Sequence, residues 1–148
     1  MLLVEKVLML KSSAIFHFTP EQELIDLAYI MNEQIVPTGT VLFEKGDEGD
    51  SLYMIYKGSV RIHDGDYSIA ILGESEIFGE LSLLDAEPRS ATATTWEECT
   101  LLELSQHPFY EVLQNNPNIL KGIMKTLCQR LRATDKNATE ISNLFQNK

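Results

Sequence analysis

The spacing of hydrophobic positions changes twice along the chain and divides it into three sections. In residues 1–34, hydrophobic side chains recur at helical steps, which predicts helices, with Thr19 capping the second one. Residues 35–104 hold short stretches of β-branched and aromatic residues, separated by turn signals such as Asp64-Gly65. Strands at this spacing predict an antiparallel sandwich or barrel. Residues 105–148 return to helical spacing, so the predicted fold class is mainly β with flanking helices.

The last section also carries a heptad repeat. From residue 120 to residue 145, its hydrophobic positions alternate steps of four and three residues. Two interpretations are open: the helix packs on its own barrel, or it forms a parallel seam with a second copy of the chain. The run is too long for one small barrel to cover, which favours a homodimer. The seam positions are Leu120, Met124, Leu127, Leu131, Thr134, Ala138, Ile141 and Phe145.

The charge distribution limits the function classes. The chain has 12 basic and 22 acidic residues, a net charge of −10, and residues 1–110, with six basic and 19 acidic residues, carry −13. Such a surface repels nucleic acid, so we expect none to bind, and a bound anion needs a local, partly buried site. We expect a reduced, cytoplasmic protein, because Cys99 and Cys128 lack metal-site spacing and no apolar run reaches a membrane span. The first residues also lack the features of a signal peptide.

Residues 78–92 have the features of an anion site. Gly79 permits a tight turn, and the residues after it favour a short helical turn with free N–H groups at its start. Arg89 is the only basic residue in residues 62–120, and an isolated arginine beside a helix start suits a phosphate. Glu80 can accept a hydrogen bond from a sugar hydroxyl. The alternative is a surface ion pair between Glu80 and Arg89 that only closes a loop.

No arrangement of residues indicates catalysis. Metal-dependent cupins also use a barrel of this kind, but they need clustered histidines with a carboxylate. His17, His63 and His107 each stand alone in the sequence, and no Ser-His-Asp or Cys-His arrangement has supporting context. We therefore expect a protein that is not an enzyme and that uses no catalytic cofactor or metal. The cupin is kept as the less favoured alternative.

Two motifs resemble those of the cyclic nucleotide-binding domain family, which includes the bacterial catabolite activator proteins. The stretch FGELSLLDAEPRSAT, from Phe78, is similar to the phosphate-binding cassette of that family. The stretch GDEGDSLYMIYKGSV, from Gly46 to Val60, is similar to a second family motif upstream. The resemblance covers about residues 14–134. It implies an eight-stranded jelly-roll (double-stranded β-helix) barrel, with N-terminal helices before it and a long C-terminal helix after it.

The resemblance implies ligand-binding roles within the cassette. Glu80 is expected to bind a ribose 2′-hydroxyl, and Arg89 is expected to pair with a cyclic phosphate. The strand from Ile69 to Leu72 is expected to supply part of the base wall. Backbone N–H groups are expected to complete the phosphate site at Gly79, Leu81, Ser82 and Ser90.

The long C-terminal helix also resembles that of catabolite activator proteins. On this match, Arg130 is expected near the phosphate and Thr134 against the base at the dimer seam. A polar threonine at a seam position is costly without a partner, and a ligand contact would explain it. The chain departs from that subfamily at the next position, Asp135, where the subfamily carries a hydroxyl. The resemblance therefore does not define the base contact at residue 135, on which nucleotide selectivity depends.

The predicted function is a cyclic nucleotide-binding sensor domain that signals through its C-terminal helix. The resemblance implies 3′,5′-cyclic AMP as the ligand, because eukaryotic members that prefer cyclic GMP often carry a threonine at the position of Ser90; cyclic GMP is the second option. The alternative is a degenerate domain that binds no nucleotide and serves in dimerisation or docking. Without the helix-turn-helix of catabolite activators, the chain is expected to be a standalone sensor or a piece of a larger protein whose effector is not identified. The expected parts are a domain at 1–134, built from helices 1–34, barrel 35–104 and helices 105–134, and a helical extension at 135–148.

Overall fold

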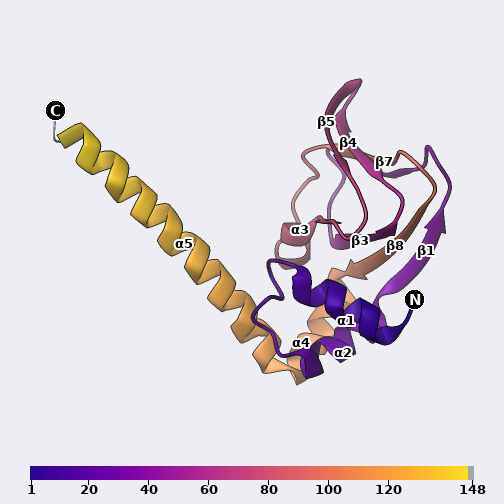
Figure 1. The fold of residues 1–148 in the computed structure, drawn as a ribbon, viewed down its shortest axis with the longest axis horizontal. Coiled ribbons are helices and arrows are strands. Elements are labelled where there is room, and N and C mark those ends of the chain that lie inside the picture. The colour runs from indigo at the N-terminus through magenta and orange to yellow at the C-terminus, as the bar shows by residue number, and fades with distance from the viewer. Residues whose placement is uncertain (147–148) are drawn as a thin grey trace.

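The computed structural model describes residues 1–146 and contains two antiparallel sheets with helices before and after them (Figure 1). Two helices come first, α1 (Leu3–Ser12) and α2 (Glu21–Ile30). The strands are β1 (Asn32–Val36), β2 (Val41–Phe43), β3 (Ser51–Lys57), β4 (Val60–Asp64), β5 (Tyr67–Leu72), β6 (Ile77–Phe78), β7 (Thr92–Thr95) and β8 (Cys99–Ser105). The remaining helices are α3 (Glu80–Leu84), α4 (Gln106–Asn115) and α5 (Pro117–Gln146).

The strand pairing is that of a jelly roll. The two sheets have the orders β1-β8-β3-β6 and β2-β7-β4-β5, so most neighbours in a sheet are distant in sequence. In the first sheet, for example, Leu52 of β3 lies opposite Leu104 of β8. The predicted turn at Asp64-Gly65 joins β4 to β5, and Gly65 has a φ of 55°. The predicted fold class, mainly β with flanking helices and a long C-terminal helix, is confirmed.

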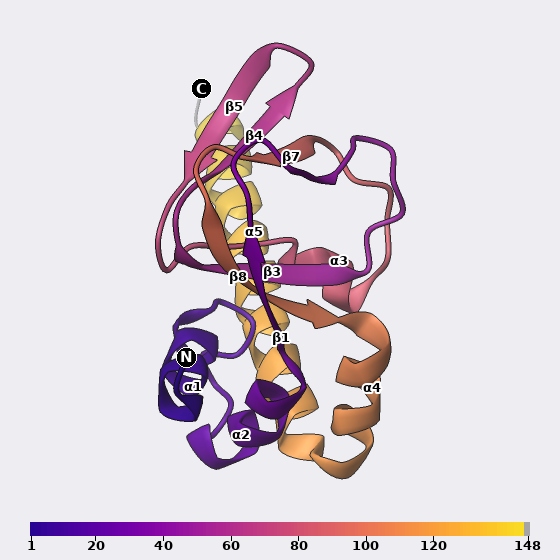
Figure 2. The same ribbon diagram turned by 90° about the vertical axis from the view of Figure 1, so that its right-hand side faces the viewer.

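Hydrophobic side chains are buried on both faces of the β1-β8-β3-β6 sheet. Leu52 and Met54 of β3 pack with the helices, while Ile55 packs with Val60 and other residues inside the barrel. Successive side chains of a strand point to opposite faces, so β3 needs apolar residues at almost every position. Figure 2 shows α1, α2 and α4 gathered below β3 and β8. The helices therefore close one side of the sheet, and the other side faces the interior of the barrel.

The predicted cap at Thr19 is wrong, and Asn116, just before α5, bonds to the preceding helix. Helix α2 begins at Glu21 with no side-chain capping bond, and Thr19 is completely buried. Thr19 lies against Gly122 of α5, and this packing, not the start of α2, determines its position. Helix α5 begins at Pro117, but the Asn116 side chain donates from Nδ2 to the carbonyl of Val112 in α4. Thr19 therefore responds to a tertiary contact with α5, whereas Asn116 makes a local bond to the last turn of α4.

Helix α5 is anchored only at its base and then leaves the body of the molecule (Figure 1). Ile119, Ile123 and Thr126 are buried, whereas every residue from 127 to 144 is exposed. Its own barrel therefore does not cover the heptad seam over these residues, and the homodimer stays a prediction. Phe145, the last seam position, lies outside the described side chains. No helix among the described residues is both long and apolar enough to cross a membrane.

We expect Gly122→Ala to destabilise the docking of α5. A Cβ at Gly122 would lie 2.7 Å from Thr19 Oγ1 and 3.2 Å from the Thr19 backbone nitrogen. Overpacking of this kind costs roughly 1–3 kcal/mol, which outweighs the gain of about 1 kcal/mol from removing a helical glycine. Urea denaturation should show a lower free energy of unfolding. Adding Thr19→Ala should restore part of the loss, and a Gly122→Ala variant more stable than wild type would contradict this packing.

Candidate functional site

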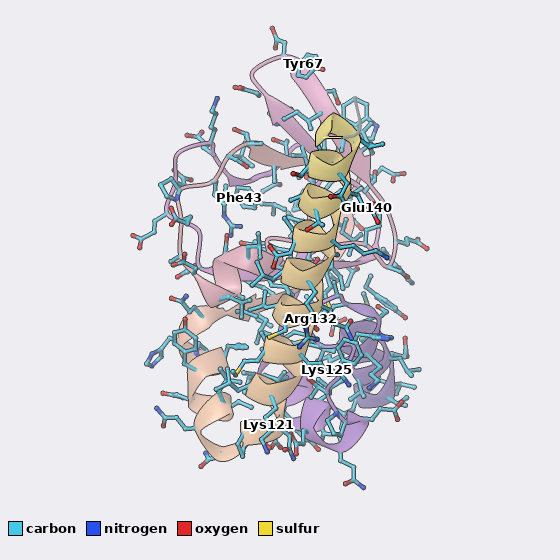
Figure 3. The ribbon with its side chains drawn as sticks, turned by 90° about the vertical axis from the view of Figure 1, so that its left-hand side faces the viewer. Phe43, Tyr67, Lys121, Lys125, Arg132 and Glu140 are labelled. Atoms are coloured by element: carbon cyan, nitrogen blue, oxygen red, sulfur yellow. The ribbon has the colours of Figure 1, made fainter. Side chains whose placement is uncertain are left out.

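A cavity of about 860 Å³ lies between the barrel and the base of α5. The barrel contributes Phe43, Ile62 and Phe78, and α5 contributes Leu127 and Arg130. Figure 3 looks at the molecule from the α5 side, with Phe43 in the barrel behind and beside that helix. The remaining wall is the predicted anion segment, in particular Gly79, Glu80, Leu81, Ser82, Arg89 and Ser90.

Helix α3 is preceded by Gly79, which no other residue replaces easily. Gly79 has a φ of 78°, and a Cβ there would lie 2.6 Å from the Ser51 carbonyl oxygen and 2.8 Å from Arg89 Nη1. The first residues of α3 line the cavity, and the N–H groups at a helix start lack acceptors within the helix. The Ser82 N–H, which was expected to be free, donates to the Gly79 carbonyl at 3.1 Å.

The two sequence motifs meet around Arg89. The Arg89 N–H donates to the Asp47 carbonyl at 2.7 Å, and the Arg89 carbonyl accepts from the Gly46 N–H at 2.8 Å. The Gly49 N–H donates to the Glu87 carbonyl at 3.0 Å. The upstream loop therefore holds the downstream loop by backbone hydrogen bonds. This pairing directs the Arg89 side chain inward.

Arg89 is a buried cation that is held by neutral groups. Arg89 is only 9% exposed to solvent. Nη2 donates to the Ser51 carbonyl at 3.0 Å, and Nη1 donates to Ser82 Oγ at 3.1 Å. The guanidinium carbon lies 4.0 Å from the centre of the Phe43 ring, within the range of a cation–π contact. Nε is buried and has no hydrogen-bond partner.

Burial opposes the charge of Arg89, and distant acidic groups support it. Burial lowers the pKa of Arg89, while Tyr53, Asp50 and Glu103 raise it. Within the described residues no carboxylate forms a salt bridge with Arg89. An arginine keeps its proton even so, because its ordinary pKa lies far above neutrality. The surface ion pair between Glu80 and Arg89, the structural alternative, is therefore not found in this part of the chain.

Glu80 is a half-buried acceptor that lacks a donor at one oxygen. Burial raises the pKa of Glu80, while Arg130 and a hydrogen bond from the Ile15 backbone lower it. Its Oε2 atom is buried without a hydrogen-bond partner. An unsatisfied buried acceptor costs about 1–3 kcal/mol. A hydroxyl supplied by a ligand would remove this cost.

Seven of the eight predicted site residues line the cavity, and one does not. Leu81, Ser90 and Arg130 are exposed residues of the lining, which leaves them open to a ligand. Thr134 lies one helical turn beyond Arg130, outside the lining, and donates from Oγ1 to the Arg130 carbonyl at 3.1 Å. Its expected contact with a base stays a prediction.

An aromatic cluster that the sequence does not reveal packs at the cavity, with Phe43 and Phe78 in the lining and Tyr53 beside them. Tyr53 and Phe78 stack with ring centres 5.2 Å apart, and Phe43 lies 6.0 Å from the Tyr53 ring. Burial raises the pKa of Tyr53 to about 12. The register of β2 is irregular between Val41 and Phe43, so alternation along this strand does not reveal the contact of Phe43 with Arg89. Ile62 of β4 lines the cavity. Residues 69–72 of β5, which were expected to form part of the base wall, are not in the lining.

Residues 1–146 contain no group of three or more His, Cys, Asp and Glu side chains that is arranged to hold a metal ion. The ligand set that a cupin needs is therefore not found among these residues.

Comparison with known proteins identifies the family. Residues 33–116, more than half of the chain, match the cyclic nucleotide-binding domain, and the chain belongs to this family. It is 35% identical over 132 residues to the cyclic AMP receptor protein of Thermus thermophilus, covering 85% of this chain and 61% of that protein. The chain thus spans less than two thirds of this relative.

Solved structures agree with that assignment. The N-terminal domain of a transcriptional regulator from Streptomyces coelicolor superimposes with a TM-score of 0.80 and 32% identity, covering 87% of this chain and 93% of that one. The regulatory domain of Toxoplasma gondii PKA, solved with cAMP, has a TM-score of 0.67 and 30% identity, covering 74% and 44%. The fold and the cassette therefore belong to a cyclic nucleotide-binding regulatory domain.

The raised pKa of Glu80 predicts a pH dependence of stability without ligand. The folded state prefers the protonated carboxyl, so its contribution is present at low pH and is lost as pH rises through the folded pKa. Glu80→Gln should remove that loss, which we expect to stay below about 1 kcal/mol because the carboxyl is only half-buried. Urea denaturation at about pH 4 and about pH 7 measures it. Parallel pH profiles for both proteins would contradict the prediction.

Proposed function

We propose that this chain is a sensor domain that binds 3′,5′-cyclic AMP in the cavity beside α5. The observation that carries the proposal is Arg89, a buried cation without a carboxylate partner, in the same cavity as the unsatisfied Glu80. A ligand with one phosphate charge and a neighbouring hydroxyl complements both groups. The relatives agree, because one is named a cyclic AMP receptor protein and another was solved with cAMP.

The cyclic phosphate binds Arg89 and the backbone N–H groups at the start of α3. Among the described residues, Arg89 Nε is buried without a hydrogen-bond acceptor, so it can donate to a phosphate oxygen. Nη1 can exchange its bond to the neutral Ser82 hydroxyl for a charged phosphate oxygen, because a charge-assisted hydrogen bond is roughly twice as strong. Ser82 and Ser90 then supply further donors.

The ribose and base occupy the rest of the cavity. The 2′-hydroxyl donates to Glu80, which satisfies the buried Oε2 atom. Arg130 adds positive charge from α5, where it already interacts electrostatically with Glu80. Thr134 reaches the base only if α5 moves toward the cavity. Ser90 favours cyclic AMP, and cyclic GMP is the second candidate.

The output of the domain is regulatory and passes through α5. We propose that residues 1–134 form the sensor, that residues 135–148 extend its helix, and that two copies pair in parallel along the exposed seam. The sensor acts in the cytoplasm and catalyses no reaction of its own. It controls an effector that these residues do not identify. The degenerate, non-binding domain remains the alternative, and a flat thermal-shift response to cyclic nucleotides would favour it.

Calorimetry with cyclic AMP, cyclic GMP and 5′-AMP tests the ligand. We expect cyclic AMP to bind most tightly, because the cavity offers one buried cation to a monoanion and a 5′-phosphate carries more charge to desolvate. Cyclic GMP should bind more weakly. Equal affinity for 5′-AMP would defeat the cyclic-phosphate proposal, and no heat with any of the three would favour the non-binding alternative.

Substitutions at Arg89 and Glu80 separate the phosphate from the sugar. Arg89→Ala should weaken cyclic AMP binding roughly 10- to 150-fold, the equivalent of 1.5–3 kcal/mol for a charged hydrogen bond. Glu80→Ala should weaken it less, and should reduce the preference for cyclic AMP over its 2′-deoxy analogue. Arg61→Ala, on the outer face of β4 near Trp96, is the matched control and should leave the affinity unchanged. Equal losses for Arg89→Ala and Arg61→Ala would overturn the phosphate assignment.

A further inference from the structure

The exposed part of α5 has a defined heptad register. Residues 120, 127, 134 and 141 occupy one seam position, d, and residues 124, 131 and 138 occupy the other, a. The apolar members are well exposed, for example Leu131 at 63% and Ile141 at 54%. The residues that flank the seam are then the e positions, 121, 128, 135 and 142, and the g positions, 123, 130, 137 and 144.

The flanking charges form one complementary combination. In a parallel pair of helices, a g residue meets the e residue of the partner that lies five positions later. Within the described part of α5, the three such combinations are residues 123 with 128, 130 with 135, and 137 with 142. Only Arg130 with Asp135 joins opposite charges, since the other two are Ile with Cys and Asn with Ser. In an antiparallel pair, e positions face e positions, so these two residues would not meet.

The same register places this combination at the cavity. Leu127 and Arg130 line the cavity of their own chain, so the g side of α5 faces its own barrel. In a parallel pair, the e side of the partner helix lies next to that g side. Figure 3 views α5 from the side away from the barrel, where Arg132 is labelled. A partner subunit would therefore bring its Asp135 to the edge of the cavity.

We propose that Arg130 of one subunit forms an ion pair with Asp135 of the partner subunit at the edge of each nucleotide cavity. This inference rests on the parallel homodimer proposed above. Arg130 then lies between two carboxylates, Glu80 of its own chain and Asp135 of the partner subunit. Twofold symmetry produces the pair twice in each dimer. The second copy thus supplies a charged residue that the single chain lacks at its cavity.

A charge reversal on α5 tests the ion pair without nucleotide. Asp135→Lys replaces two attractions by two repulsions, and we expect the dimer to dissociate about tenfold more readily at low salt. Glu140→Lys makes the same charge change on an exposed c position of the same helix and should leave dimerisation unchanged. Sedimentation equilibrium measures both, with circular dichroism confirming equal helix content. The difference should shrink when salt rises from about 0.05 M to about 0.5 M.

The double variant Arg130→Glu/Asp135→Lys restores complementary charges and should recover most of the lost dimerisation, although the cavity has then lost Arg130. Asp135→Lys and Glu140→Lys with equal effects, or a double variant no better than Asp135→Lys, would overturn the ion pair. A wild-type chain that stays monomeric at every concentration would overturn the dimer and the ion pair together. The sedimentation measurements contain no ligand. The nucleotide calorimetry therefore tests the proposed ligand independently of the dimer and the ion pair.

Discussion

The site depends on keeping one guanidinium charged inside the protein without neutralising it. Moving a cation out of water is costly, and most buried arginines recover that cost from a carboxylate. Arg89 instead has a carbonyl, a hydroxyl and the face of Phe43 as its neighbours. These groups stabilise the cation but leave its net charge in place. A molecule of net charge −10 therefore contains a buried positive charge that can attract a small anion.

Much of the surrounding structure serves to place that side chain. The loop around residues 46–50 is paired by backbone hydrogen bonds with the loop around residues 87–90. A Cβ at Gly49 would lie 2.5 Å from Arg89 Nε, so a larger residue there would displace the guanidinium. The jelly-roll pairing brings these loops together, although they are far apart in sequence. The two motifs are therefore parts of one structural unit, and neither positions Arg89 alone.

Local signals in the sequence were sufficient for the fold class, the strand-rich middle section, the long C-terminal helix and the lining of the cavity by the cassette. These features depend on periodicity and on motifs whose residues are close together. Thr19 has the composition of a helix cap, yet its contact with Gly122 of the distant helix α5 fixes the side chain elsewhere. Phe43 was missed because its role arises from Arg89, which only the folded barrel brings within 4.0 Å. Contacts between distant segments leave no periodic trace in the sequence.

Under the proposed function, the described residues offer a route from the ligand to helix α5. A ligand changes a conformation only if it contacts the two states differently. Leu127 and Arg130 are the residues of α5 in the cavity wall, and the helix beyond them is exposed. Arg130 also interacts with Glu80, which has a buried oxygen without a hydrogen-bond partner among the described residues. Under the proposed function, a ligand hydroxyl that satisfies Glu80 would change the electrostatic surroundings of Arg130 directly. Arg130 also flanks the heptad seam, so the proposed ligand and the proposed dimer would act on one side chain.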